Sequence, residues 1–187
     1  MNFLNSILVL AAAFLAVFGE SVFPGLRNLL GAQVDLLPAL MIYAALNTNI
    51  LVMALLAVFG GLWFDSLSAN PLGLSILPLF IVSFPVFLQR DLILREVPFA
   101  QLVLGGLASA AAPLISVLLL LTASKQPLLG WGSFWQWLVM IAGGAIATPA
   151  FFTFFNWCDH ALGYQPRMET SFRPDREILR GRKKIDH

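Results

Sequence analysis

The chain contains 187 residues, of which 59% are hydrophobic and only 11% are charged. Soluble globular domains contain about 45–50% apolar residues and about 25% charged residues. This composition excludes a soluble globular enzyme, a disordered chain and a fibre, and it indicates one integral membrane domain. The formal net charge is +1, yet residues 164–187 hold seven basic and four acidic residues. We therefore divide the chain into an apolar domain, 1–163, and a basic tail, 164–187.

Charge-poor stretches in the apolar domain predict an all-α, polytopic transmembrane bundle of about six helices. A membrane-spanning helix needs about 20 apolar residues. The predicted spans are residues 3–23, 34–47, 50–66, 72–89, 98–123 and 133–158. No basic segment precedes the first span and no good cleavage site follows it, so we interpret it as a retained helix rather than a signal peptide.

The second and third spans come from one charge-free stretch of 29 residues, Leu36 to Phe64. As a single helix it would be about 44 Å long, well beyond a hydrocarbon core of about 30 Å. Residues 47–49 near its middle read Asn-Thr-Asn, and these side chains favour turns because they bond to nearby backbone. We predict two short helices, with one long tilted helix as the alternative.

Six spans place both termini on the same side of the membrane. If that side is cytoplasmic, the loop 89–97 and the tail together bring nine Lys and Arg residues to it. Only Arg27 and Lys125 then lie outside, as the positive-inside rule predicts. The tail either lies on anionic lipid as an orientation signal or docks a cytoplasmic protein. Tryptophans are expected at the outer interface (Trp63, Trp131, Trp135) and at the inner one (Trp157).

Small residues four apart predict close helix packing in lipid. Such pairs occur in the first, fifth and sixth spans: Ala12 and Ala16, Gly106 and Ala110, Gly143 and Ala147. Ordinary bundle packing is the simpler interpretation, and a dedicated dimer face is the alternative.

Three polar side chains near the second and third spans need partners. Asp35 precedes an apolar run and is a candidate N-cap. Tyr43 lies mid-span, where its hydroxyl is expected to bond to another helix. Asp65 ends the third span in an apolar stretch, and a charge there is costly in lipid. It either caps the following helix or turn, or it lines a wet pocket or meets a partner chain.

No motif for catalysis, phosphate binding or metal binding appears in the sequence. Cys158, Asp159 and His160 are neighbours, but consecutive residues point in different directions on a helix, and a metal site usually has three or four converging ligands. We expect no catalytic residue, no cofactor and no metal site.

Four short segments resemble a known family. They are Asp35–Leu40 (DLLPAL), Tyr43–Leu46 (YAAL), Gly61–Leu67 (GLWFDSL) and Leu72–Gly73. In spacing and residue type they resemble the rod shape-determining protein MreD family. The resemblance covers residues 35–75, and the length, the number of spans and the basic C-terminus agree with it.

The resemblance implies a multi-pass protein of the bacterial inner membrane with both termini in the cytoplasm. It implies a fold similar to the S components of vitamin importers and a non-catalytic scaffold role in cell elongation. The implied partners are an MreC-like bitopic protein, MreB and the elongation glycosyltransferase and transpeptidase; no nucleic acid is implied. The positions carried over as partner-contact or structural candidates are Asp35, Tyr43, Asp65 and Gly73.

The alternative function is the substrate-binding membrane subunit of a vitamin importer. Such a subunit needs a ligand-sized cavity with several convergent polar groups. The spans offer few: Asn47, Asn49, Asp65 and Gln101. A membrane enzyme is the third and weakest hypothesis, because no catalytic constellation appears.

Overall fold

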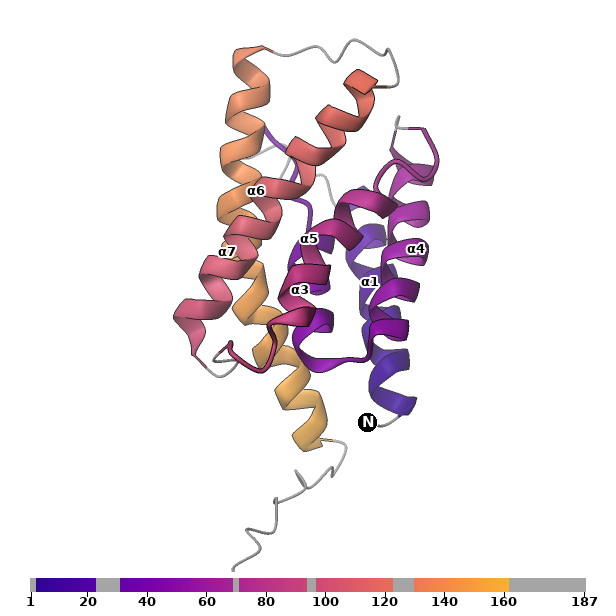
Figure 1. The fold of residues 1–187 in the computed structure, drawn as a ribbon, viewed down its shortest axis with the longest axis vertical. Helices are drawn as coiled ribbons and strands as arrows, with labels where there is room; N and C mark the ends of the chain where they lie inside the picture. The colour runs from indigo at the N-terminus through magenta and orange to yellow at the C-terminus, as the bar shows by residue number, and fades with distance from the viewer. Residues whose placement is uncertain (1–2, 23–30, 69–70, 94–96, 123–129, 162–187) are drawn as a thin grey trace, which may run out of the picture.

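A computed structural model describes residues 3–22, 31–68, 71–93, 97–122 and 130–161. These residues form an all-α bundle of six helices whose directions alternate along the long axis (Figure 1). The helices are α1 (Phe3–Val22), α3 (Leu37–Asn47), α4 (Ile50–Leu67), α5 (Ile76–Leu88), α6 (Pro98–Thr122) and α7 (Trp131–Ala161). The all-α class and the number of helices are confirmed for these residues. The predicted basic tail, 164–187, lies outside the described residues.

The predicted break between the second and third spans is present. α3 ends at Asn47, and Thr48 and Asn49 have extended backbones before α4 begins. The Thr48 hydroxyl donates to the Ala44 carbonyl oxygen at 2.6 Å. The Thr48 N–H donates to the same oxygen at 2.8 Å. The helical bonds of α3 end at Thr48, so the Asn-Thr-Asn segment separates two helices rather than lying inside one.

Three helices are long and apolar enough to cross a membrane: α4, α6 and the Trp131–Cys158 part of α7. The chain is therefore a multi-pass membrane protein. α3 has 11 residues and α5 has 13, which makes them about 16 and 20 Å long, shorter than a hydrocarbon core of about 30 Å.

These two helices are shorter than the predicted spans 34–47 and 72–89. Residues 34–36 are not helical, and the Leu36 N–H donates to the Glu20 side chain of α1. The segment 72–75 forms a turn in which Gly73 has φ +88°, a left-handed conformation that favours glycine. Hydropathy did not reveal either shortening, because Val34, Leu36, Leu72 and Leu74 continue the apolar pattern of the helices that follow.

The short helix α3 forms the centre of the bundle. All ten residues from Leu37 to Leu46 are buried, and α3 contacts α1, α4, α5, α6 and α7. A helix that is apolar all round is expected to be surrounded by other elements. In contrast, large apolar side chains of α4, α6 and α7 are exposed on the outside, as expected for helices that face lipid.

The longest helices, α6 and α7, approach closely through small residues. A Cβ on Gly105 would overlap the Thr148 hydroxyl and lie 2.6 Å from the Gly144 carbonyl oxygen. The predicted pairs included Gly106 and Gly143: Gly106 also packs on α7, against Ala145 and Ile141, whereas on α7 the contact is made by Gly144 rather than Gly143. The one-residue difference arises because the helices cross at Gly105 and Gly144, and Gly143 faces Val34 instead.

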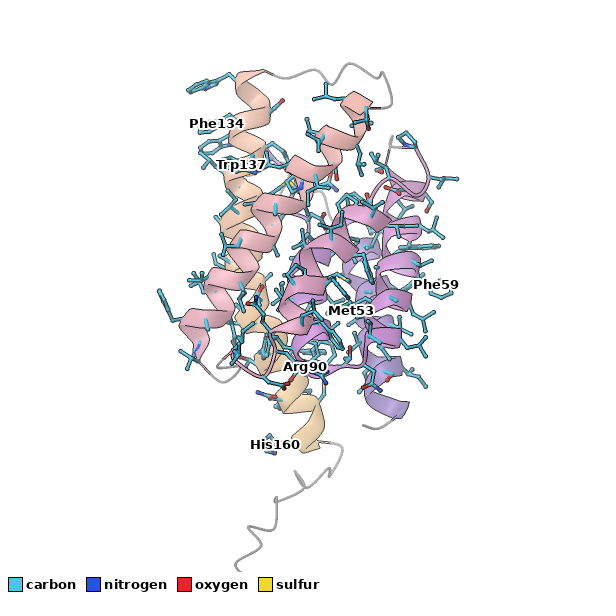
Figure 2. All side chains as sticks on the ribbon, viewed as in Figure 1. Met53, Phe59, Arg90, Phe134, Trp137 and His160 are labelled. Atoms are coloured by element: carbon cyan, nitrogen blue, oxygen red, sulfur yellow. The ribbon has the colours of Figure 1, made fainter. Side chains whose placement is uncertain are left out.

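The two ends of the bundle differ in composition. We name them the Trp131 end, where α7 begins, and the Arg90 end, where α5 finishes; Figure 2 shows Phe134 near the first and Arg90 and His160 near the second. Trp63, Trp131 and Trp135 lie toward the Trp131 end, and Trp157 lies toward the other. Tryptophan favours membrane interfaces because its ring is apolar and its N–H is polar.

Candidate functional site

The candidate site is built around α3, whose two ends stop inside the protein. The first N–H groups and last carbonyl groups of any helix lack partners within the helix. An unpaired backbone group in a hydrocarbon environment costs several kcal/mol. A buried short helix in a membrane therefore needs polar partners at both ends, and these partners are the polar residues of interest.

Two carboxylates hold the N-terminal end of α3. Glu20, in the last turn of α1, accepts the Leu36 N–H at 2.7 Å, and Asp35 accepts the Leu37 N–H at 2.9 Å. Negative charge at a helix N-terminus also interacts favourably with the helix dipole. Asp35 was predicted as the N-cap residue. The helix begins at Leu37, so the N-cap position belongs to Leu36. Asp35 lies one residue before it and still accepts a bond from the first helical residue.

A glutamine pair supports the non-helical segment that leads into α3. The Gln33 N–H donates to the Gln136 side-chain oxygen at 2.9 Å, and the Gln136 amide donates back to the Gln33 carbonyl oxygen. Gln136 lies five residues into α7, about 7.5 Å along the helix from Trp131. Irregular backbone at membrane depth is tolerated where protein groups satisfy it, and Gln136 meets this requirement.

The second oxygen of Glu20 is the least satisfied atom of this end. Glu20 Oε2 is buried and has no hydrogen-bond partner among the described residues. Sequence reasoning did not single out Glu20 or Gln136. Glu20 is the one charged residue within α1. A single carboxylate in an apolar helix is the sequence feature that could have identified it.

Arg90 holds the opposite end of α3. Its guanidinium donates to the Thr48 carbonyl oxygen at 3.2 Å and lies 4.6 Å from the centre of the Phe87 ring. Cations near a helix C-terminus bond to its last carbonyls and complement its dipole. α3 therefore carries acidic groups at its N-terminus and a basic group at its C-terminus, each in the favourable orientation.

Asp65 makes local bonds within the α4–α5 connection. Its side chain is 1% exposed, and it accepts the Ser75 N–H at 3.1 Å and the Ser75 hydroxyl at 2.6 Å. Ser75 is the N-cap residue of α5. The sequence left two roles for Asp65: a cap of the following helix or turn, or a contact with a wet pocket or a partner chain. The geometry matches the first role, because the carboxylate is inside the protein and already bonded to Ser75.

Tyr43 joins α3 to α7 through aromatic contacts. Its ring stacks on Phe155 with centroids 4.2 Å apart and meets Phe152 edge to face at 5.0 Å. Aromatic pairs at these separations contribute about 0.5–1.5 kcal/mol beyond their buried area. The four positions carried over from the resemblance thus lie at or beside the contacts that order α3, α4 and α5.

A small cavity connects two of these positions. It has a volume of about 210 Å³ and lies where α3 and α5 begin, against α6. Asp35, Ser75 and Ser116 supply its polar groups, and apolar side chains supply the rest. Asp35 and the Asp65–Ser75 pair therefore border the same space, whereas Tyr43 lies elsewhere, against α7.

Two larger apolar hollows lie on the outside of the bundle. A groove between α1 and α4 has a volume of about 340 Å³, and a wedge between α6 and α7 has a volume of about 810 Å³. The groove is lined by small and aromatic residues: Leu10, Ala13, Phe14, Leu56, Phe59, Gly60 and Trp63.

The described residues contain no group of three or more His, Cys, Asp or Glu side chains placed to hold a metal ion. Cys158 is half-buried and His160 is exposed. No protein-family model, curated protein or solved structure matches this chain.

Proposed function

We propose that this protein is a non-catalytic scaffold of the bacterial cell-elongation machinery in the inner membrane, with both termini cytoplasmic. It would bind an MreC-like single-span protein and, with MreB and the elongation synthases, guide peptidoglycan synthesis and maintain cell shape. The proposal rests on the resemblance to the MreD family over residues 35–75. A fold related to the S components of vitamin importers belongs to the same proposal.

The observation that carries the proposal is the position of the resembling residues. Asp35, Tyr43, Asp65 and Gly73 belong to the contacts and turns that order the buried α3 and its neighbours. Residues with this role hold the inner helices in place, and the outer faces of the bundle remain available for partners. Such a distribution suits a protein that works by binding, because these residues hold the helices in place and take part in no chemistry.

We assign the groove between α1 and α4 to the partner's membrane helix. Helices associate in lipid mainly by close packing, which small residues permit, and Ala13 and Gly60 line this groove. Its aromatic members are exposed: Phe59 is 62% exposed and Phe14 is 48% exposed. The ring of Phe14 lies 4.7 Å from that of Trp63 across the two helices, so the rim is already ordered before a partner binds.

A vitamin-importer subunit remains the second candidate function. The cavity favours it, since three polar residues line it: Asp35, Ser75 and Ser116. Its volume of about 210 Å³ is below the range of about 300–1,000 Å³ typical of small-molecule sites. The scaffold is therefore the better supported of the two.

The test is co-purification of the full chain with a co-expressed MreC-like protein from the same organism. Phe59→Ala should reduce the recovered partner about tenfold, corresponding to a loss of about 1.4 kcal/mol. Phe99→Ala is the matched control, because Phe99 lies on α6, is 74% exposed and is outside the groove.

Equal loss with both variants, or no partner with the unaltered chain, would contradict the scaffold proposal. Native mass spectrometry of the same preparation addresses the second candidate. A bound metabolite of small-molecule size that is lost in Ser116→Leu would support the importer subunit.

A further inference from the structure

The two halves of α6 differ in packing. From Pro113 to Thr122 the helix buries no residue, and Leu114, Leu118 and Leu121 are each more than half exposed. α6 is therefore a packed half followed by a half that is partly exposed along its whole length. The buried residues of α6 all precede Pro113: Gln101, Gly105, Gly106, Ala108, Ser109 and Ala112.

The half beyond Pro113 lies between two hollows. The wedge of about 810 Å³ lies between it and α7, and the cavity of about 210 Å³ lies between it and the starts of α3 and α5. Pro113, Val117 and Met140 line both spaces, so this part of α6, together with Met140 of α7, separates one hollow from the other. Because protein interiors are normally close-packed with few voids, empty space on both sides leaves this half-helix room to move.

Pro113 supplies a hinge between the two halves. It lies inside α6, where a proline has no N–H to donate to the carbonyl four residues earlier and its ring disfavours a straight helix. The Ser109 carbonyl oxygen therefore lacks its usual helical donor. Sharp helix kinks are found mostly at proline, and Figure 1 shows α6 leaning away from α7 toward the Trp131 end.

The structure on the other side of the hinge is fixed by hydrogen bonds between elements. The Trp137 N–H donates to the Ala110 carbonyl oxygen at 3.0 Å, which ties the turn before Pro113 to α7. The start of α7 is held in turn by the paired bonds between Gln136 and the Gln33 backbone. The half of α6 beyond Pro113 is therefore the part that can move against a fixed α7.

Beyond the hinge, α6 has no such tie among the described residues. The Ser116 hydroxyl donates to the Ala112 carbonyl oxygen at 3.0 Å, within α6 itself. The Thr122 hydroxyl donates to the Leu119 carbonyl oxygen at 2.7 Å, also within α6. Apart from Ser116, residues 114–121 are apolar, so a movement of this half against its neighbours breaks no side-chain hydrogen bond to them.

We propose that residues 114–122 form a hinged gate between the outer wedge and the cavity beside Asp35. Rotation of the gate about Pro113 toward α7 narrows the wedge and opens the cavity to water from the Trp131 end. The polar residues that line the cavity are Asp35, Ser75 and Ser116, and water in a cavity needs such partners. Opening would therefore hydrate a carboxylate that holds the start of α3.

The gate lies on a different helix from the groove assigned to the partner, and it does not depend on the scaffold role. The co-purification test above and the tests of the gate can therefore fail separately.

The first test measures the reactivity of a cysteine in the cavity, with Cys158→Ser as the background and the full chain in lipid vesicles. Leu79→Cys places a thiol in the cavity wall, where the native side chain is 2% exposed. The thiolate is the reactive form and apolar burial suppresses it, so N-ethylmaleimide should modify this thiol only when the gate admits water. Met53→Cys is the matched control, because Met53 is 0% exposed and lies outside the cavity.

We expect the cavity thiol to react about tenfold faster than the control thiol, equivalent to a difference of about 1.4 kcal/mol in the free energy of opening. Pro113→Ala restores a helical N–H and stiffens α6, so it should slow the reaction of the cavity thiol to the level of the control. Pro149→Ala makes the same change inside α7, outside the lining of both hollows, and it should leave the rate unchanged.

A distance measurement follows the gate directly and leaves Pro113 in place, so it also serves if Pro113→Ala does not fold. Spin labels at Leu62 on α4 and Leu121 on α6 report on the gate, and labels at Leu62 and Leu107 report on the packed half; all three side chains are exposed. Leu121 lies about 12 Å along the helix from Pro113, so a rotation of about 20° moves it by about 4 Å. We expect the Leu62–Leu121 distance distribution to be broader than the Leu62–Leu107 distribution by about this amount.

Three outcomes would overturn the proposal. Equal reactivity of Leu79→Cys and Met53→Cys would mean that the cavity stays closed. Equal slowing by Pro113→Ala and Pro149→Ala would mean that Pro113 is not the hinge. Equally narrow distance distributions for the two label pairs would mean that α6 moves as one rigid helix.

Discussion

The central helix α3 and the long helix α7 are both apolar, yet they are stabilised in different ways. α3 is buried on every side from Leu37 to Leu46. α7 buries one stripe of small and apolar residues against the bundle: Val139, Gly144, Thr148, Phe152 and Phe155. Other large side chains of α7, among them Trp131, Ile146 and Trp157, are exposed.

This difference shows that apolar composition in a membrane protein does not determine burial. α7 is long enough to end at both interfaces, where water satisfies its end groups, so it needs only one packed face. α3 ends inside the protein, so it depends on Glu20, Asp35 and Arg90 for the bonds that water would make. Disrupting each arrangement should therefore require a different kind of substitution.

The largest expected effect comes from separating α6 and α7. Gly105→Ala should lower the free energy of unfolding by about 3 kcal/mol, because the added Cβ would overlap Thr148 and approach the Gly144 backbone. The measurement is denaturant unfolding of the purified protein in detergent. Gly132→Ala is the control, because nothing lies within 4 Å of its added Cβ, and it should be neutral or slightly stabilising. Equal behaviour of the two variants would contradict the close helix contact.

The next largest effect is expected at the N-terminal end of α3. Glu20→Leu should cost about 2 kcal/mol, because it leaves the Leu36 N–H without its acceptor. Glu20→Gln keeps an acceptor oxygen for the Leu36 N–H, so it should be about as stable as the unaltered protein.

Hydrogen exchange of the Leu36 amide checks this prediction. The amide should exchange much faster in Glu20→Leu and remain protected in Glu20→Gln. Protection in both variants would mean that Glu20 does not hold this end of the helix.

The smallest effect is expected at the opposite end. Arg90→Ala should cost about 1 kcal/mol, since it removes one bond to the Thr48 carbonyl and the contact with Phe87. Arg90→Lys keeps the positive charge at the helix end and should recover part of the loss. Thermal unfolding in detergent compares the two variants, and a full loss with Lys would show that guanidinium geometry rather than charge is required.

Much of the helix order could be predicted from the sequence. Six apolar stretches correspond to six helices, and Asn47-Thr48-Asn49 marks a real break because its side chains compete with helical bonds. Asp35 was a candidate cap, and it does bond to the first turn of α3. These features depend on residues close together in the chain, so local chemistry decides them.

The site around α3 could not be predicted in the same way. Gln33 and Gln136 are 103 residues apart, and Arg90 reaches Thr48 across 42 residues. No spacing rule connects such pairs, because their meeting depends on how five helices surround a sixth. The resemblance pointed to Asp35 and Asp65 but not to Glu20, whose acceptor role exists only when the end of α1 lies beside the start of α3.

The amino-acid sequence by itself was enough to predict an all-α membrane protein, and its predicted spans correspond to the six helices of the described residues, because hydropathy and turn residues act over short stretches. Only the tertiary structure decided which apolar helix is buried and which faces lipid. Buried and lipid-facing helices are both apolar, so composition does not distinguish one from the other. The distinction arises where a helix ends, since an end inside the protein requires polar side chains from other elements.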